Sequence, residues 1–118
     1  MNHNDLTYIN HITDAIKDIE YSTKNLSKEG FKDSKDIKDA CIRRLEIIGE
    51  AIKKISQETK NKYLRIKWKQ IAGTRDRIIH AYFNVNLDIV WDIIKINIPV
   101  LKIEILGIKK DLEKFHKY

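Results

Sequence analysis

Apolar residues recur at three- and four-residue spacing along most of this chain, which is the pattern of amphipathic helices. A first series in the N-terminal part comprises Leu6, Ile9, Ile12, Ile16 and Ile19. A second series, after a polar stretch, comprises Ile37, Cys41, Leu45, Ile48, Ile52 and Ile55. No segment shows the strict alternation of apolar and polar residues that is typical of a half-buried strand. The pattern therefore predicts an all-α protein.

Polar residues mark where these two helices begin and end. Asn4 or Asp5 can accept hydrogen bonds from the first free N–H groups of the first helix and so cap it. Gly30 and the polar residues around Asp33 are expected to form the first connection, and Asn61 is expected to lie in the second.

A short helical turn and one further helix are expected between the second helix and the last one. Trp68, interpreted as a core anchor, lies in the short turn, which ends or bends at Gly73. The further helix begins near Thr74 and fades by Asn84, where an Asn-Val-Asn sequence favours a turn. With the last helix this gives an antiparallel bundle of four main helices plus a short helix, in a single domain of residues 1–118.

The last helix, capped by Asn86 with Asp88 near its positive end, has apolar residues on two faces. One series comprises Leu87, Trp91, Ile94, Ile98, Leu101, Ile105, Ile108, Leu112 and Phe115. The other comprises Ile89, Val90, Ile93, Ile96, Val100 and Ile103. A step of two residues turns a helix by about 200°, so the two series lie on nearly opposite faces. One face can fill the protomer's own core, and we expect the other to bind a second copy in a homodimer with isologous contacts.

Pro99 interrupts the backbone hydrogen bonding of this last helix. Proline has no N–H to donate, and its ring crowds the carbonyl of Lys95, four residues earlier. A kink is expected there. The alternative is that two separate helices meet at the Ile98–Pro99 bond.

Composition narrows the class of protein. Cys41 is the only cysteine, which excludes an intrachain disulfide and fits a reducing cytoplasm. Its phase within the second apolar series indicates a small core residue and not a nucleophile. No secretory signal is visible. Charged and polar residues interrupt the most apolar stretch, residues 89–108, so a soluble cytoplasmic protein that does not enter a membrane is expected.

Positive charge gathers in one segment. Residues 1–60 hold 11 basic and 11 acidic residues, whereas residues 61–118 hold 12 basic and 6 acidic residues. Segment 60–77 alone has seven basic residues against Asp76, a net charge of +6. Such a stretch can attract a polyanion, although a solvated surface is the ordinary meaning of a charge run. The RNA-binding candidates in it are Lys60, Lys62, Arg65, Lys67 and Lys69.

The eight residues from Arg75 to Tyr82, RDRIIHAY, offer the candidate chemistry. Arg75 is permanently cationic and can form two hydrogen bonds to a phosphate, and His80 can exchange a proton near neutral pH. RNA is cut without a metal when its own 2′-OH attacks the adjacent phosphate, a reaction that needs a base, an acid and a cation. Because one histidine cannot conveniently be both base and acid, the motif favours two copies that face each other in a dimer.

Helix geometry suggests further roles in this segment. Arg75 and His80 are five residues apart, a rotation of about 140°, so Arg75 has to lie at a bent helix start or reach around the helix. Asp76 is one turn before His80 and can orient the imidazole and favour its protonated form. Arg77 is a second phosphate candidate, and Tyr82 lies on the same face as Arg75.

No metal and no cofactor are expected. His3, His11 and His116 are scattered, without cysteine or carboxylate partners at the spacing of metal ligands. A lone histidine in a helix is more often a surface or core residue than a catalytic one, so His80 alone does not establish an enzyme.

The chain resembles the HEPN superfamily and, within it, the HepT-like toxins. The residues that show this are the Gly49-Glu50-Ala51 sequence, then Trp68, Ile71 and Gly73, and then Arg75-Asp76 with His80 and Tyr82. The resemblance covers essentially the whole length. One departure is visible, because many relatives have prolines just before the tryptophan, where this chain has Leu64 and Lys67. That difference concerns only the shape of the local loop.

The resemblance implies a homodimeric helical bundle in which two Arg–His motifs line a shared cleft and act as a metal-independent endoribonuclease on tRNA or mRNA. It assigns catalysis to Arg75 and His80, with Asp76 in support. It also implies an MntA-like nucleotidyltransferase antitoxin that transfers AMP from ATP to Tyr82. A bulky anionic adduct beside Arg75 and His80 would block the cleft and bind its cations.

Two other functions are compatible with the sequence. The chain can be a non-catalytic subunit that presents a nucleotide or a substrate to a separate nucleotidyltransferase, with the basic segment binding phosphate but not cutting it. A purely structural helical adaptor has no support beyond the expected fold. An assay of RNA cleavage separates these functions from that of a ribonuclease.

Overall fold

The structure, a computed structural model, describes residues 3–73 and 86–116. Its elements are α1 (His3–Thr23), α2 (Lys28–Asp33), α3 (Lys35–Lys54), α4 (Gln57–Lys62), α6 (Leu87–Asp92), the π-helical turn η2 (Ile93–Asn97) and α7 (Ile98–His116). Residues 68–73 are also helical. The described residues contain no strand, so the predicted all-α class is confirmed.

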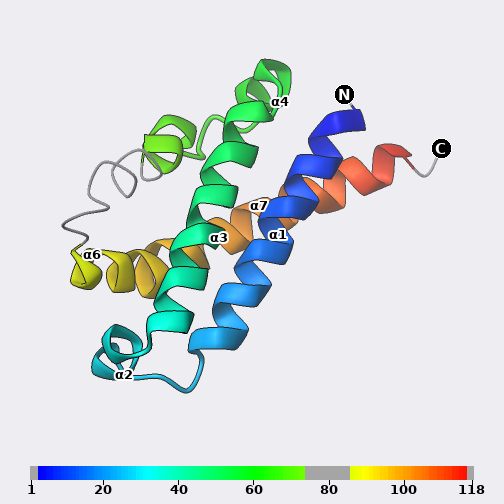
Figure 1. Cartoon of the computed structure of the whole chain (residues 1–118). Helices are drawn as coiled ribbons and strands as arrows, with labels where there is room; N and C mark the ends of the chain where they lie inside the picture. Colours follow the sequence, from blue (N-terminus) through cyan, green and yellow to red (C-terminus); the bar gives the residue numbers. More distant parts are fainter. Residues whose placement is uncertain (1–2, 74–85, 117–118) are drawn as a thin grey trace.

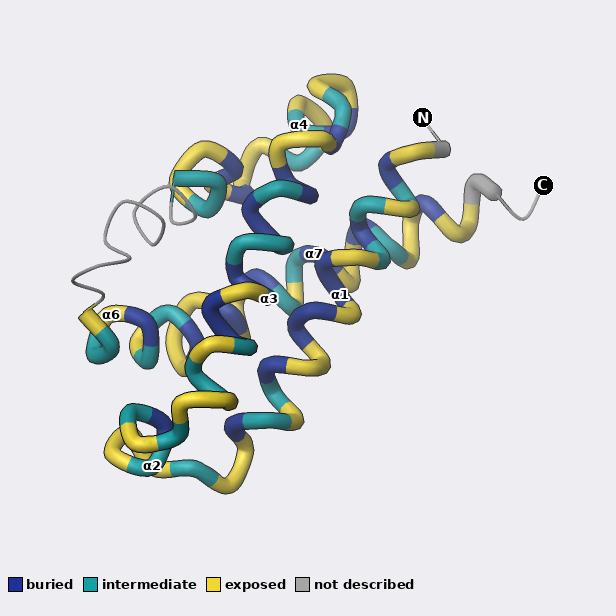
Figure 2. The backbone as a smooth tube through the Cα atoms, in the orientation of Figure 1, coloured by how far each residue is buried: buried dark blue, intermediate teal, exposed yellow. Residues whose placement is uncertain are grey.

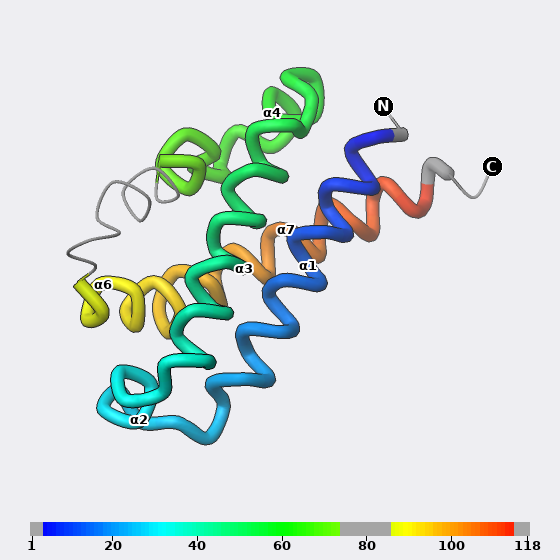
Figure 3. Tube along the Cα trace, viewed as in Figure 1, coloured from blue at the N-terminus to red at the C-terminus, as the bar shows by residue number. Residues whose placement is uncertain are grey.

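Three long helical stretches form the body of the molecule. Helices α1 and α3 run antiparallel, and the continuous stretch α6–η2–α7 crosses behind them (Figure 1). In the colours of Figure 3, blue α1 and green α3 form this hairpin over orange α7, and α1 contacts both of the other long helices. Helix α2 packs against α3 and α6, where the rings of Phe31 and Trp91 lie 5.2 Å apart.

The core consists of the apolar series that the sequence predicts. Ile9, Ile12, Ile16 and Ile19 on α1 are at most 1% exposed. Burying an isoleucine side chain contributes roughly 1.5–3 kcal/mol, so these four positions alone account for much of the driving force on α1. Cys41 is completely buried, and burial raises the pKa of its thiol. The interpretation of Cys41 as a core residue is therefore confirmed.

The C-terminal helical stretch has one buried face and one exposed face, as predicted (Figure 2). The buried residues are Val90, Ile94, Ile98, Leu101, Ile105, Ile108 and Leu112. The exposed ones, which we call the apolar stripe, are Ile89, Ile96, Val100, Ile103 and Leu106. The assignment of Val90 to the second face was wrong, because Val90 is one helical turn before Ile94 and shares its buried face.

The distortion expected from Pro99 takes the form of a π-helical turn. In η2 the N–H of Ile98 donates to the carbonyl of Ile93, five residues earlier. The turn ends just before Pro99 and includes Lys95, the residue at which the kink was expected. Helical conformation continues from Leu87 to His116, so two separate helices do not meet at Ile98–Pro99.

Helix α2 occupies the place where a connection around Gly30 and Asp33 was expected. The Ser27 hydroxyl accepts a hydrogen bond from the N–H of Gly30 at 3.0 Å and so caps this helix. Phe31 is completely buried and anchors it to the core. A six-residue helix with one apolar anchor is too short to show helical periodicity, so the sequence pattern could not reveal it.

Helix α4 likewise occupies the expected connection at Asn61, and its N-terminus explains the role of Asp5. The predicted capping of the first helix by Asp5 was wrong: α1 begins at His3, and Asp5 binds the start of α4. One carboxylate oxygen accepts from the N–H of Ser56 at 2.8 Å. The other accepts from the hydroxyls of Ser56 and Thr59, both at 2.6 Å. This hydrogen-bond network fixes α4 to the beginning of the chain.

Asp5 is ionised within this network. The side chain is 1% exposed, and burial raises its pKa, but the hydrogen bonds from Ser56 and Thr59 outweigh burial, so the pKa lies below its ordinary value. Replacing one partner of a buried charged hydrogen-bond network leaves the other groups unsatisfied, which is costly. Asp5 is thus a structural residue.

No helix in residues 3–73 and 86–116 combines the length and the apolar character needed to cross a bilayer. Even the mostly apolar α7 is interrupted by Lys102, Glu104 and Lys109.

Asp5→Ala should lower the free energy of unfolding at neutral pH by about 2–3 kcal/mol, because charged hydrogen bonds are lost. Since the folded pKa is depressed, this stabilisation is present above the unfolded pKa of about 3.9 and is lost as the pH falls through the folded value. Urea unfolding at a series of pH values measures the difference from the wild type. Asp14→Ala, at an exposed position on α1, is the matched control. A difference that does not shrink in acid would contradict this account.

Candidate nucleic-acid interface

The motif residues Arg75, Asp76, Arg77, His80 and Tyr82 lie outside the described residues. Their predicted roles therefore stay predictions. What the structure describes is the chain on each side of the motif segment, up to Gly73 and again from Asn86.

The chain after the motif segment is fixed by a cap and by ion pairs. The Asn86 side-chain oxygen accepts from the N–H groups of Asp88 at 3.0 Å and Ile89 at 3.4 Å, so the predicted cap is confirmed. Asp88 in turn binds the ammonium groups of Lys28 and Lys32 on α2, each at 3.2 Å. The hydrogen bonds from Lys32 and Lys28 hold the pKa of Asp88 below its ordinary value. The start of α6 is thereby attached to α2.

The chain before the motif segment is fixed by buried and hydrogen-bonded aromatic residues. Trp68 is 8% exposed, which confirms it as a core anchor, and its indole N–H donates to the carbonyl of Tyr63 at 3.1 Å. The Tyr63 hydroxyl donates to Asp111 on α7. Burial and this hydrogen bond raise the pKa of Tyr63 to about 12, so the phenol keeps its proton. Ile66, 2% exposed, completes the attachment.

Four lysines line one shallow groove of about 660 Å³ beside this anchored segment. Lys60, Lys67 and Lys69 were predicted as RNA-binding candidates, and Lys53 on α3 joins them. We call this the lysine groove. Burial lowers the pKa of Lys60, against the opposing effect of Asp5, whereas Lys67 and Lys69 are exposed. No acidic side chain is among the described residues that line the groove, so it attracts anions.

The other two predicted cations lie apart from the lysine groove. Lys62 is exposed, and its ammonium lies 5.9 Å from the centre of the Tyr63 ring. Arg65 lines a second concavity. Of the five candidates, Lys60, Lys67 and Lys69 line the lysine groove, Arg65 lines the second pocket and Lys62 lines neither, and their binding of RNA stays a prediction.

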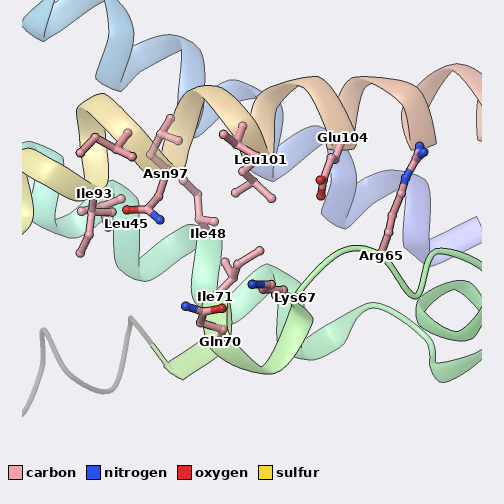
Figure 4. Close-up of a pocket in the computed structure, with 13 residues that line it drawn as sticks. Leu45, Ile48, Arg65, Lys67, Gln70, Ile71, Ile93, Asn97, Leu101 and Glu104 are labelled. Atoms are coloured by element: carbon pink, nitrogen blue, oxygen red, sulfur yellow. The ribbon is translucent and has the colours of Figure 1, made fainter.

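A smaller, more enclosed pocket of about 350 Å³ lies between the 65–71 segment and the η2–α7 stretch (Figure 4). Its apolar lining consists of Leu45, Ile48, Ile71, Ile93, Ile96, Ile98, Val100 and Leu101. Its polar lining consists of Arg65, Lys67, Gln70, Asn97 and Glu104. Lys67 and Gln70 also line the lysine groove, so they form a ridge that both concavities share.

The described residues offer few reactive groups. They contain no cluster of three or more His, Cys, Asp or Glu side chains placed to hold a metal ion. The buried Cys41 has a raised pKa and so does not provide a thiolate nucleophile. The described part of the molecule thus supplies cations and a pocket.

Fold and charge define a basic helical protein suited to bind a polyanion, and comparison with known proteins identifies its family. The family model described as Ribonuclease HepT-like matches residues 12–108. A Thermococcus cleftensis protein named "Probable ribonuclease HepT" is 42% identical over 95 residues, 80% of this chain and 86% of that protein. A Methanocaldococcus jannaschii protein named "Putative RNase" is 43% identical over 106 residues, 90% of this chain and 88% of that protein. The chain belongs to the HepT-like ribonuclease family.

One further relative is longer. A Methanocaldococcus jannaschii protein named "Gamma-glutamylcyclotransferase and putative RNase" is 48% identical over 107 residues, which are 91% of this chain. They cover 48% of that protein, so the chain spans about half its length. No solved structure matches the chain significantly.

Replacing Lys53 and Lys69 by glutamine should weaken the binding of single-stranded RNA. The slope of log binding constant against log salt concentration should become shallower by about 0.7 for each phosphate contact that is lost. Fluorescence anisotropy of a labelled 2′-O-methyl RNA, which lacks the attacking 2′-OH, measures this at several salt concentrations. Lys17 and Lys110, exposed on α1 and α7, supply the control double substitution. Equal slopes for both double variants would rule out the lysine groove as an RNA site.

Proposed function

We propose that this protein is the toxin of a toxin–antitoxin system and an endoribonuclease that cuts RNA without a metal. The observation that carries the proposal is the family membership together with the Arg75–His80 motif. The motif segment lies between two anchored flanks, and a lysine groove adjoins one of them. These features support the binding of a phosphodiester near the motif.

The chemistry needs only the substrate and the motif side chains. His80 takes the proton of the ribose 2′-OH, and the oxygen attacks the adjacent phosphorus. Arg75, with Arg77, neutralises the charge that develops on the phosphate oxygens. The 5′-oxygen leaves with a proton, and a 2′,3′-cyclic phosphate remains. The second proton transfer is assigned to His80 of a second copy, while Asp76 orients the imidazole.

The apolar stripe supports the dimer that this chemistry needs. Ile96, Val100 and Ile103 are 62%, 57% and 74% exposed. Several exposed apolar side chains at helical spacing on one face favour the binding of another protein. Because the stripe lies along the continuous stretch α6–η2–α7, a two-fold axis across it would bring identical residues of two copies together. A second copy of this chain is the occupant that we propose.

His80→Ala and Arg75→Ala should each reduce RNA cleavage in excess EDTA at least a hundredfold, the order of a lost proton transfer or a lost charge-stabilising donor. Circular dichroism checks that both variants keep their helices, and His11→Ala, at an exposed position on α1, serves as the control. Cleavage that survives both substitutions would exclude this site. RNA that is bound but left uncut by the wild type would favour a non-catalytic subunit of a nucleotidyltransferase.

We further propose that a nucleotidyltransferase antitoxin neutralises the toxin by AMP transfer to Tyr82. The adduct adds negative charge beside Arg75 and His80, where it competes with the RNA phosphate.

Co-expression with the transferase should add AMP to the chain and abolish cleavage. Tyr82→Phe should prevent the mass increase, because the acceptor hydroxyl is missing, and intact mass spectrometry measures it. Tyr21→Phe is the control, since Tyr21 is 78% exposed and therefore available to an unselective transferase. An AMP adduct that persists in Tyr82→Phe would show that another residue is modified.

A further inference from the structure

We propose that the pocket between the 65–71 segment and η2–α7 binds one unpaired nucleobase of the RNA and prefers guanine. This inference rests on the proposed ribonuclease function and specifies its substrate. It concerns only residues that the structure describes, and their proposed role is to bind a base, whereas that of the motif is to cut the phosphodiester.

The shape and lining of the pocket suit an aromatic base. Its volume of about 350 Å³ falls in the range of small-molecule sites, which are mostly apolar with a few polar groups at defined places. The apolar part consists of isoleucine, leucine and valine side chains from three separate segments. In Figure 4 the Ile71 side chain points from the 65–71 segment toward Ile48 and Leu101 on the other side of the pocket. A planar base can pack between such walls.

The polar groups of the pocket have capacity for a ligand. Within the part of the chain that the structure describes, the side chains of Lys67, Asn97 and Glu104 form no hydrogen bond or ion pair. Figure 4 shows Glu104 projecting from α7 toward the opposite wall, while the Arg65 side chain extends from that wall toward α7. The pocket thus presents one carboxylate, one amide and two cations around an apolar interior.

These groups match guanine better than the other bases. A carboxylate only accepts hydrogen bonds. Guanine alone presents two adjacent donors on its Watson–Crick edge, N1–H and the 2-amino group, whereas adenine and cytosine pair one donor with an acceptor and uracil has a single donor. Glu104 can therefore bind guanine with both oxygens. The side-chain amide of Asn97 can donate a hydrogen bond to the O6 atom of guanine.

The walls of the pocket include residues close in sequence to both ends of the motif segment. Ile71 on one wall lies three residues before the motif segment begins at residue 74, and Ile93 on the other wall follows it. The ridge of Lys67 and Gln70 joins the pocket to the lysine groove. An RNA strand can bind with its phosphates in that groove and insert one unstacked base into the pocket on the other side of the ridge. Proteins commonly recognise single-stranded RNA through such unstacked bases.

The apolar stripe raises the competing possibility that a second copy fills the pocket. Ile96 and Val100 belong both to the stripe and to the pocket wall. Inside the pocket the charges favour RNA, because Arg65 and Lys67 complement an RNA phosphate, whereas a second copy would bring the same net positive charge against them.

The test is equilibrium binding of 2′-O-methyl oligonucleotides, which cannot be cut through a 2′-OH. Each is an oligouridine strand with a single central guanine, inosine or adenine. The wild type should bind the guanine strand about tenfold more tightly than the other two, within the range that a bidentate base contact supplies. Inosine is the matched ligand, because it lacks only the 2-amino group.

In Glu104→Gln the ratio of the affinities for the guanine and inosine strands should fall close to one. The affinity for the adenine strand should stay within about twofold of the wild-type value, since only one base contact changes. Glu113→Gln, exposed on the same helix α7, should keep the wild-type ratio. Equal affinities of the wild type for all three strands, or a ratio that Glu104→Gln does not change, would overturn the proposal. So would a Glu104→Gln variant that alters only the dimer dissociation constant in sedimentation.

The binding assay does not depend on cleavage, so the two proposals fail separately. A guanine preference without any RNA cleavage would refute the catalytic function and keep the base pocket. Cleavage by the wild type without a base preference in binding would refute the base pocket and keep the catalytic function.

Discussion

The C-terminal helical stretch has apolar side chains on two opposite faces, and one protomer can cover only one of them. Ile105 is completely buried, whereas Ile103, two residues earlier, is 74% exposed. The buried face packs against α1 and belongs to the core, so its side chains cannot turn outward without opening that core. The exposed face is therefore a fixed surface, and it supports the dimer that we propose.

Both ends of the motif segment are held by anchors that reach distant parts of the chain. Trp68 and the Tyr63–Asp111 hydrogen bond fix the preceding segment, and Asp88 with its two lysine partners fixes the following helix. Rigid flanks allow a short segment to present catalytic groups in a defined geometry, which matters because proton transfer and phosphate binding need placement within hydrogen-bond reach. The lysine groove and the pocket adjoin the same anchored segment, so the two proposed binding sites share one supporting structure.

Long helices could be predicted from the sequence because several turns repeat the same apolar spacing, as on α1 and α7. The six-residue helices α2 and α4 could not, since they contain fewer than two turns. The role of Asp5 was hidden for another reason, because its partners lie more than 50 residues away. The same limit applies to the sites: Lys53 and Glu104 are separated in sequence from the basic segment, and only the packing of α3 and α7 brings them beside it.

The most direct test of a site shared by two protomers is the rate of RNA cleavage per protomer, measured in excess EDTA across protein concentrations that span the dimer dissociation constant from sedimentation. Our account predicts that the rate per protomer rises in proportion to the fraction of dimer and levels off when all of the protein is dimeric. A rate per protomer that stays constant while the dimer dissociates would contradict it, as would cleavage that EDTA abolishes.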